Sequence, residues 1–229
     1  MLPIKDLVDE IIIVDLESKD STAEIARRFT NKFSVRPFDN DLSASRNAAV
    51  RQASMDWILV LDADEIVFKE EMRALKKFIV NAEADAYILL TRNYTNNRKL
   101  MGWAASSVIA GFDGFTVSKS IRLFRNFKGI SYRYPVNPTL LPTLHALGAK
   151  ISEIDDVVVH NLGYDPFEVL RFDWLISQVR EFPHDIANRY FLASMLMQKG
   201  QLDKAKEHFG EIAKIDAKFK RTLTNLGTI

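Results

Sequence analysis

The sequence contains no cysteine, which excludes disulfide bonds, thiolate metal sites and a cysteine nucleophile. Its apolar runs reach only about six residues, far short of the ~18 that a membrane-spanning helix needs. No block of like charge is present, and 31 basic residues nearly balance 30 acidic ones, which argues against a nucleic-acid partner. The first ten residues do not form a signal peptide, because they are interrupted by Lys5, Asp6, Asp9 and Glu10.

One stretch organises what is present. Residues 57–61 form an unbroken apolar run, Trp-Ile-Leu-Val-Leu, and Asp62, Ala63, Asp64 and Glu65 follow it. The run has no polar alternation, so it predicts a strand buried on both faces, as in parallel sheets. Ligands of open α/β sheets bind just beyond the carboxyl ends of strands. On extended backbone Asp62 and Asp64 would point the same way, so they could share one hard divalent cation.

The rest of the chain predicts an α/β protein. Further strands are expected at 11–14, 33–37, 85–91, 119–125, 130–136 and 154–160. Helices are expected from a capping box at Ser21 to Glu24, and over 40–54, 70–81 and 166–181. Residues 93–118 lack clear periodicity and predict a long functional loop.

Beyond Pro183 the pattern predicts helices alone, with a turn at Gly200. Small and bulky residues occur there at the spacing of a 34-residue tetratricopeptide repeat: Leu192, Ala193, Leu196, Ala205, Phe209 and Ile212. We therefore expect a sheet domain over 1–182 and a short helical hairpin over 183–229. One repeat cannot stack into a solenoid, so the hairpin is expected to cap the body or to belong to a longer chain.

Several motifs in order resemble family-2 glycosyltransferases, specifically bacterial members with a C-terminal tetratricopeptide repeat. The motifs are Asp9-Glu10-Ile11-Ile12-Ile13-Val14-Asp15, Leu42-Ser43-Ala44-Ser45-Arg46-Asn47, residues 56–65, Ile121-Arg122-Leu123-Phe124-Arg125-Asn126 and His160-Asn161-Leu162-Gly163-Tyr164. The resemblance implies a GT-A fold, a Rossmann-like mixed sheet flanked by helices. It also implies inverting transfer of a sugar from a nucleotide-diphosphate donor to an acceptor hydroxyl.

The resemblance assigns a metal site to this chain. Asp62 and Asp64 would bind Mn²⁺ or Mg²⁺, and His160 would be a late ligand near the diphosphate. Such an ion neutralises the charge that develops on the leaving diphosphate, and it prefers oxygen ligands. The alternatives are a solvated turn for the two acids and a hydrogen-bonded core position for the histidine.

The nucleotide sugar would contact Asp15, Asp20, Arg46 and Asp62 by the same resemblance. Helix capping is the alternative for Asp15 and Asp20, and a surface ion pair is the alternative for Arg46. Arg122 and Arg125 are predicted to be solvated or structural rather than catalytic. The acceptor is expected to be a glycan, a lipid-linked glycan or a protein, and the expected location is the cytoplasm, including the inner face of the membrane. The C-terminal helices are a candidate surface for protein contacts.

Three positions depart from the family pattern. The family's first, central strand has no counterpart before Ile11, which predicts a fragment, a mis-set start or a substitute strand. The expected catalytic base falls at Pro138, preceded by Asn137, and neither side chain accepts a proton at neutral pH. The loop glycine after the second strand is Glu17.

The missing base leaves the catalytic residue open. Substitute bases are Asp113, Asp155 and Asp156. A non-catalytic relative that binds partners is therefore the second hypothesis. A haloacid-dehalogenase-like phosphatase is the third, but Ile66 replaces the threonine or valine that it requires. A nucleotidyltransferase on a similar sheet would need a glycine-rich, lysine-containing loop, which the sequence does not show.

Overall fold

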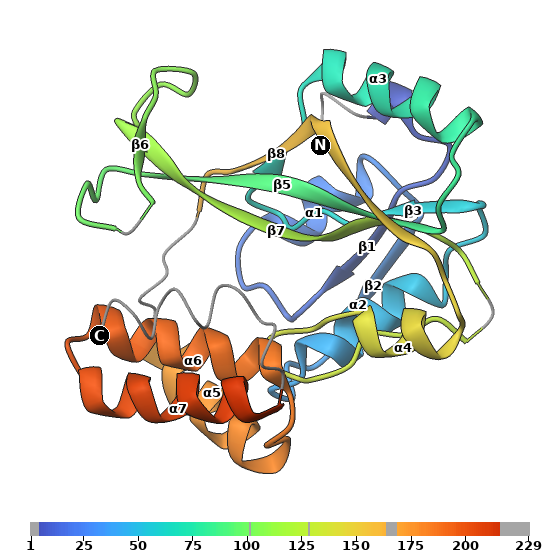
Figure 1. Ribbon diagram of the computed structural model, residues 1–229. Helices are drawn as coiled ribbons and strands as arrows, with labels where there is room; N and C mark the ends of the chain where they lie inside the picture. The colour runs from blue at the N-terminus through green and yellow to red at the C-terminus, as the bar shows by residue number, and fades with distance from the viewer. Residues whose placement is uncertain (1–4, 101, 128, 164–168, 216–229) are drawn as a thin grey trace. The chain divides into compact units, whose positions relative to one another are not determined.

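The computed structural model describes residues 5–100, 102–127, 129–163 and 169–215 (Figure 1). Contacts divide the chain into two compact units. The α/β unit comprises residues 1–133 and 138–164, and the helical unit comprises residues 134–137 and 165–229. Helix α5 (Val169–Glu181) thus groups with the helices that follow it, although the sequence-based division placed it with the sheet.

The first described element of the α/β unit is a short 3-10 helix, η1 (Lys5–Leu7), and strands and helices follow it. Its strands are β1 (Ile12–Asp15), β2 (Lys32–Val35), β3 (Trp57–Leu59), β4 (Glu65–Ile66), β5 (Ala86–Thr95), β6 (Ala104–Ala105), β7 (Gly114–Arg125) and β8 (Ile151–Asn161). Its helices are α1 (Thr22–Arg27), α2 (Leu42–Val50), α3 (Lys69–Val80) and α4 (Leu141–Ala146).

The main sheet has six strands and is mixed, which confirms the predicted α/β class. The order is β3-β7-β5-β8-β4, with β6 paired to β7. Only β5 and β8 are parallel neighbours, whereas β3 pairs antiparallel with β7 and is partly buried along its length. The predicted parallel direction was therefore wrong for β3, because an apolar run alone does not fix strand direction. Its two faces do pack on the two cores of the sheet, Trp57 and Leu59 on one and Ile58 on the other.

Helices cover both faces of this sheet (Figure 1). Alternate residues of β5 and β7 point to opposite faces. Tyr87, Leu89 and Leu123 join one core with α3, while Ala86 and Phe124 join another with α2 and α4. Since both faces are buried, the sheet ends are the places where polar groups can reach solvent.

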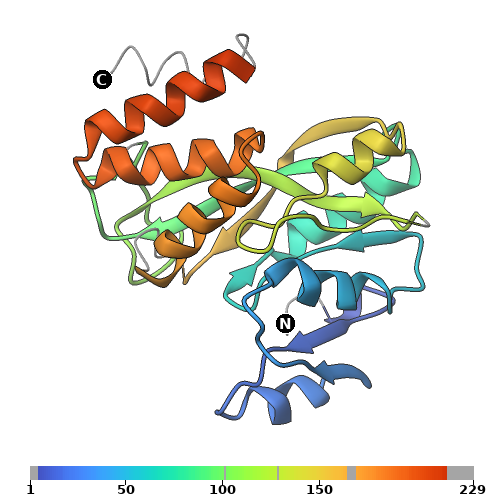
Figure 2. The same cartoon turned by 90° about the horizontal axis from the view of Figure 1, so that it is seen from below.

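A second, smaller sheet lies in the N-terminal lobe, where β1 and β2 pair in parallel and with no other described strand. Figure 2 shows this blue segment, with α1, at one side of the unit. The predicted capping box at Ser21 is wrong, because the Ser21 side chain makes no cap hydrogen bond. The side chain of Asp20 accepts a hydrogen bond from the Thr22 amide instead, at 2.9 Å.

Two other segments differ from the prediction. Both ends of the expected loop over 93–118 are strand, because β5 extends to Thr95 and β7 starts at Gly114. A Cβ at Gly114 would lie 2.5 Å from the Trp103 ring, so only glycine allows that aromatic to close on the strand. Residues 130–136 form no strand, apart from one isolated bridge between Arg133 and Thr139. Helix α4, which the sequence did not predict, follows this segment.

The helical unit contains α5, α6 (Ile186–Gln198) and α7 (Leu202–Ile215), which confirms two helices around a turn at Gly200. Leu192, Ala193, Leu196, Ala205, Phe209 and Ile212 are all buried in its core. No helix in the described part of the chain combines the length and apolarity that crossing a membrane requires.

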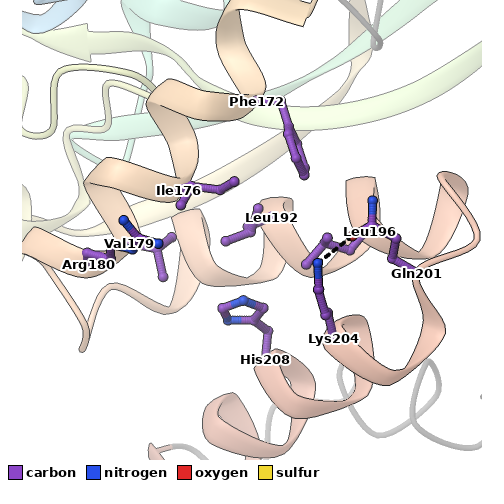
Figure 3. A pocket seen from close by; sticks show the side chains of 9 residues that line it. All are labelled: Phe172, Ile176, Val179, Arg180, Leu192, Leu196, Gln201, Lys204 and His208. Atoms are coloured by element: carbon purple, nitrogen blue, oxygen red, sulfur yellow. Dashed lines mark hydrogen bonds between the residues drawn. The ribbon is translucent and has the colours of Figure 1, made fainter.

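A groove of about 280 Å³ lies among the three helices of this unit (Figure 3). It is lined by Phe172, Ile176, Val179, Arg180, Leu192, Leu196, Gln201, Lys204 and His208. Burial and the neighbouring charge of Arg189 lower the pKa of His208, so this ring is neutral at pH 7. None of the site residues predicted from the sequence lines this groove. The predicted nucleotide and metal ligands all belong to the α/β unit.

Candidate functional site at the end of strand β3

The two predicted metal ligands lie on a tight turn rather than on extended backbone. The Glu65 amide donates to the Asp62 carbonyl at 3.1 Å, which closes the turn between β3 and β4. The Glu65 carboxylate accepts from the Asp62 amide at 2.8 Å. Both Asp62 and Asp64 are exposed. The expectation that the two acids lie on extended backbone was therefore wrong.

Glu65 connects this turn to the main sheet. Its side chain is fully buried and forms a two-pronged ion pair with Arg122 of β7, at 2.6 and 3.0 Å. Burial raises the pKa of Glu65; the Arg122 charge opposes that rise, and the charges of Asp62 and Asp64 add to it. The sequence identified Arg122 as solvated or structural, and its side chain is only 11% exposed. The pair holds residues 62–65, which we call the acid turn, against the sheet.

Arg46 reaches the same turn from helix α2. Asp41 caps that helix by accepting from the Ala44 amide at 3.0 Å. One Arg46 nitrogen donates to both oxygens of Asp62, at 2.8 and 3.0 Å. Its guanidinium also lies 5.5 Å from the Tyr132 ring centre. The structure thus brings together Arg46 and Asp62, which the sequence assigned to one site from motifs sixteen positions apart.

Asp64 lies against the glycine of the motif that follows β8. The Leu162 amide donates to the Asp64 carbonyl at 2.9 Å. A Cβ placed on Gly163 would lie 2.3 Å from an Asp64 carboxylate oxygen and 2.8 Å from its Cβ. Gly163 belongs to the motif over 160–164, but no role for it was predicted from the sequence. Its role in the structure is to leave room for the Asp64 side chain.

Asp15 and Asp20 belong to the N-terminal lobe. Asp15 ends β1, is buried, and accepts from the Ser18 amide at 3.1 Å and its hydroxyl at 2.5 Å. Asp20 is exposed, and hydrogen bonds from Thr22 lower its pKa. No hydrogen bond or ion pair within the described residues joins either acid to Asp62. Between them Glu17 adopts a positive φ of 59°, the conformation that favours the glycine expected there, and its side chain is exposed.

His160 occupies the interior rather than the acid turn. It is 2% exposed, its Nδ1 lies 3.0 Å from the Tyr94 hydroxyl, and its ring centre lies 4.3 Å from that of Phe68 in a tilted arrangement. Its Nε2 lies 3.4 Å from Glu71 and makes no hydrogen bond. In the part of the chain that the structure describes, no three His, Asp or Glu side chains converge as a metal site. The structure therefore does not bring His160 to Asp62 and Asp64.

The three candidate bases also lie apart from the turn. Asp113 pairs with Arg98 at 2.7 Å and precedes β7, nine residues or about 30 Å of strand away from Arg122. Asp155 and Asp156 occupy the irregularity where the pairing of β8 with β5 jumps from Ile154 to Val158, and both are exposed. Asn137 is exposed in the loop after Arg133. None of the three candidates has a hydrogen bond or ion pair to Asp62, Asp64 or Glu65 among the described residues.

Comparisons with known proteins give the chain its family. The sequence model described as Glycosyl transferase family 2 matches residues 4–152. A TPR repeat-containing protein of Synechococcus elongatus is 30% identical over 89% of this chain and 49% of its own length. The SPbeta prophage-derived glycosyltransferase SunS of Bacillus subtilis is 25% identical over 72% of this chain and 36% of its own length. The chain thus spans half or less of the curated relatives it matches.

TarS of S. aureus is among the solved structures to which this chain is similar. Its 1-349 form in complex with UDP-GlcNAc is 17% identical, with a TM-score of 0.47 over 91% of this chain and 74% of that one. The family model alone covers well over half of the 229 residues and includes the whole acid turn. The chain belongs to glycosyl transferase family 2.

Proposed function

We propose that this chain is a metal-dependent, inverting glycosyltransferase that moves a sugar from a nucleotide-diphosphate donor to an acceptor hydroxyl. One observation carries the proposal. Two exposed carboxylates, Asp62 and Asp64, follow β3 on one turn, and Asp62 lies beside the guanidiniums of Arg46 and Arg122. Such an arrangement can hold a cation and an anion side by side, as a diphosphate and its counter-ion require.

The donor set of the turn suits Mg²⁺ or Mn²⁺. Both carboxylates are exposed and offer only oxygen, and two protein ligands leave the remaining positions for phosphate oxygens and water. An ion held there would neutralise the charge on the departing diphosphate. Arg46 would bind the diphosphate, and Asp15 and Asp20 would face the base and ribose. His160 remains a proposed ligand only if the interior around Tyr94 rearranges.

A donor-binding relative without transfer activity is the second candidate. It is favoured by the positions of Asp113, Asp155 and Asp156, none of which contacts the acid turn among the described residues. In that case the site would hold the nucleotide sugar while the helical unit contacts protein partners. We further propose that α6 and α7 form the tetratricopeptide-like hairpin, a proposal supported by their core positions and by the name of the Synechococcus relative.

Replacing Asp62 and Asp64 together with asparagine tests the proposal. Calorimetry with UDP, and release of UDP from UDP-GlcNAc, would be measured with and without Mn²⁺; GDP and dTDP sugars extend the panel. Removing both charges is expected to weaken Mn²⁺-dependent binding by at least about 100-fold, because the ion loses both protein ligands. Metal-dependent binding that survives both substitutions would exclude this site.

Asp56→Asn is the matched control, since Asp56 is an exposed acid just before β3 and is expected to leave binding unchanged. Tight binding without hydrolysis or transfer in the unmodified chain would favour the second candidate. Failure of every nucleotide to bind with Mn²⁺ present would contradict both.

A further inference from the structure

The Asp62 carboxylate already has two cationic partners before any metal or donor arrives. Arg46 donates to both of its oxygens, at 2.8 and 3.0 Å, and a nitrogen of Arg122 lies 3.7 Å away. A divalent ion at the turn would need the same oxygens. Metal binding, as proposed above, therefore competes with a contact within the protein.

The two arginines differ in their freedom to leave. Arg122 is committed to the fully buried Glu65 by a two-pronged pair, and breaking it would strand a buried charge. Arg46 pairs with one carboxylate within the described residues, and that carboxylate is Asp62, whose side chain is 45% exposed. This pair is partly exposed, at 26% for Arg46 and 45% for Asp62, so breaking it costs less than breaking the buried pair of Arg122 with Glu65.

The charges around the turn favour joint binding. A divalent ion alone would lie beside the cations of Arg46 and Arg122, and a diphosphate alone would face the acids Asp62 and Asp64. With both bound, Asp62 and Asp64 would hold the ion while the guanidinium of Arg46 would bind the phosphate oxygens. Like charges are then separated by opposite ones, and each ligand removes the obstacle to the other.

We infer that Arg46 is a latch on Asp62 that the donor diphosphate opens, so that metal and donor bind cooperatively. The inference rests on the proposed donor site. Linkage makes the effect reciprocal: Mn²⁺ tightens nucleotide binding by the same factor by which nucleotide tightens Mn²⁺ binding. Arg122 and Glu65 act as positioning residues that keep the turn in place during the exchange.

Arg46→Met tests the latch, because methionine keeps an unbranched side chain but removes the charge. Mn²⁺ binding without nucleotide is measured by electron paramagnetic resonance, and UDP binding with and without Mn²⁺ by calorimetry. Arg51→Met is the matched control, since Arg51 is exposed at the end of the same helix and pairs with no described carboxylate. Circular dichroism and thermal melting confirm that both variants fold.

Without nucleotide, Arg46→Met is expected to bind Mn²⁺ about three- to tenfold more tightly than the unmodified chain. With saturating Mn²⁺ it is expected to bind UDP about tenfold more weakly, so the cooperativity shrinks. Arg46→Lys, which keeps the charge, should retain most of it. Arg51→Met should match the unmodified chain in every measurement.

Unchanged or weaker Mn²⁺ binding by Arg46→Met in the absence of nucleotide would overturn the latch. That result is distinct from a failure of the proposed function. If UDP binds the unmodified chain with Mn²⁺ and the Asp62→Asn, Asp64→Asn variant loses that binding, the donor site stands although the latch is wrong. If UDP does not bind the unmodified chain with Mn²⁺, the donor site itself is wrong.

Discussion

Replacing Arg122 with methionine is expected to lower the free energy of unfolding by about 3 kcal/mol at pH 8, because it leaves the buried Glu65 carboxylate without its partner. Chemical denaturation followed by circular dichroism measures the loss. Arg125→Met on the same strand is the control. Arg125 lies 3.8 Å from Asp85 and is 38% exposed, so its loss is expected to be about 1 kcal/mol or less.

The loss should depend on pH in a defined direction. Burial raises the pKa of Glu65 in the folded protein, and removing the Arg122 charge raises it further. A raised pKa means that the folded state binds the proton more tightly, so stability falls as pH rises through that pKa. Arg122→Met should therefore lose less stability at pH 5 than at pH 8. Adding Glu65→Gln should recover part of the loss at pH 8; equal losses at both pH values with no recovery would contradict this account.

Gly163→Ala is expected to weaken Mn²⁺-dependent UDP binding by about tenfold or more. The added Cβ would meet the Asp64 carboxylate at 2.3 Å, so the carboxylate must leave its place at the turn. Gly163 has no positive φ that would strain the alanine backbone, so the effect is confined to the contact. Calorimetry at saturating Mn²⁺ measures it.

A double-mutant cycle separates this effect from a general disturbance. If the alanine acts by displacing Asp64, then adding Gly163→Ala to Asp64→Gly, which also removes the Cβ that the alanine would meet at 2.8 Å, should cost no further affinity. Additive losses would show that the segment after β8 contributes in another way, and the assigned role of Gly163 would be wrong.

The sequence predicted those site features that depend on motif order. Arg46 and Asp62 were assigned to one site from separate motifs, and the structure joins them at 2.8 Å. It could not predict the turn at Asp62, because the turn depends on the distant partner Arg122, which buries Glu65 beneath it. Alternation along a strand gives the direction of a side chain only while the backbone stays extended.

His160 illustrates a second limit. An apolar strand that ends in histidine suits both a ligand and a core position, and only the partners decide. In the structure these are Tyr94 on β5 and Phe68 before α3, which are 66 and 92 positions away in sequence. The miss at 93–118 has a similar cause, since β7 finds its register by pairing with β5 rather than by its own pattern.

The small sheet of β1 and β2 has a consequence for how this protein moves. Two paired strands are marginal by themselves, and in β1, α1 and β2 only Asp15 and Ala26 are buried. Segments with so few buried apolar contacts open by local unfolding at low free energy. Amide hydrogens there are expected to exchange with solvent much faster than those of β5. The lobe that carries Asp15 and Asp20 is thus expected to unfold locally more easily than the main sheet. If a nucleotide binds there, it is expected to slow the exchange of amide hydrogens in this lobe.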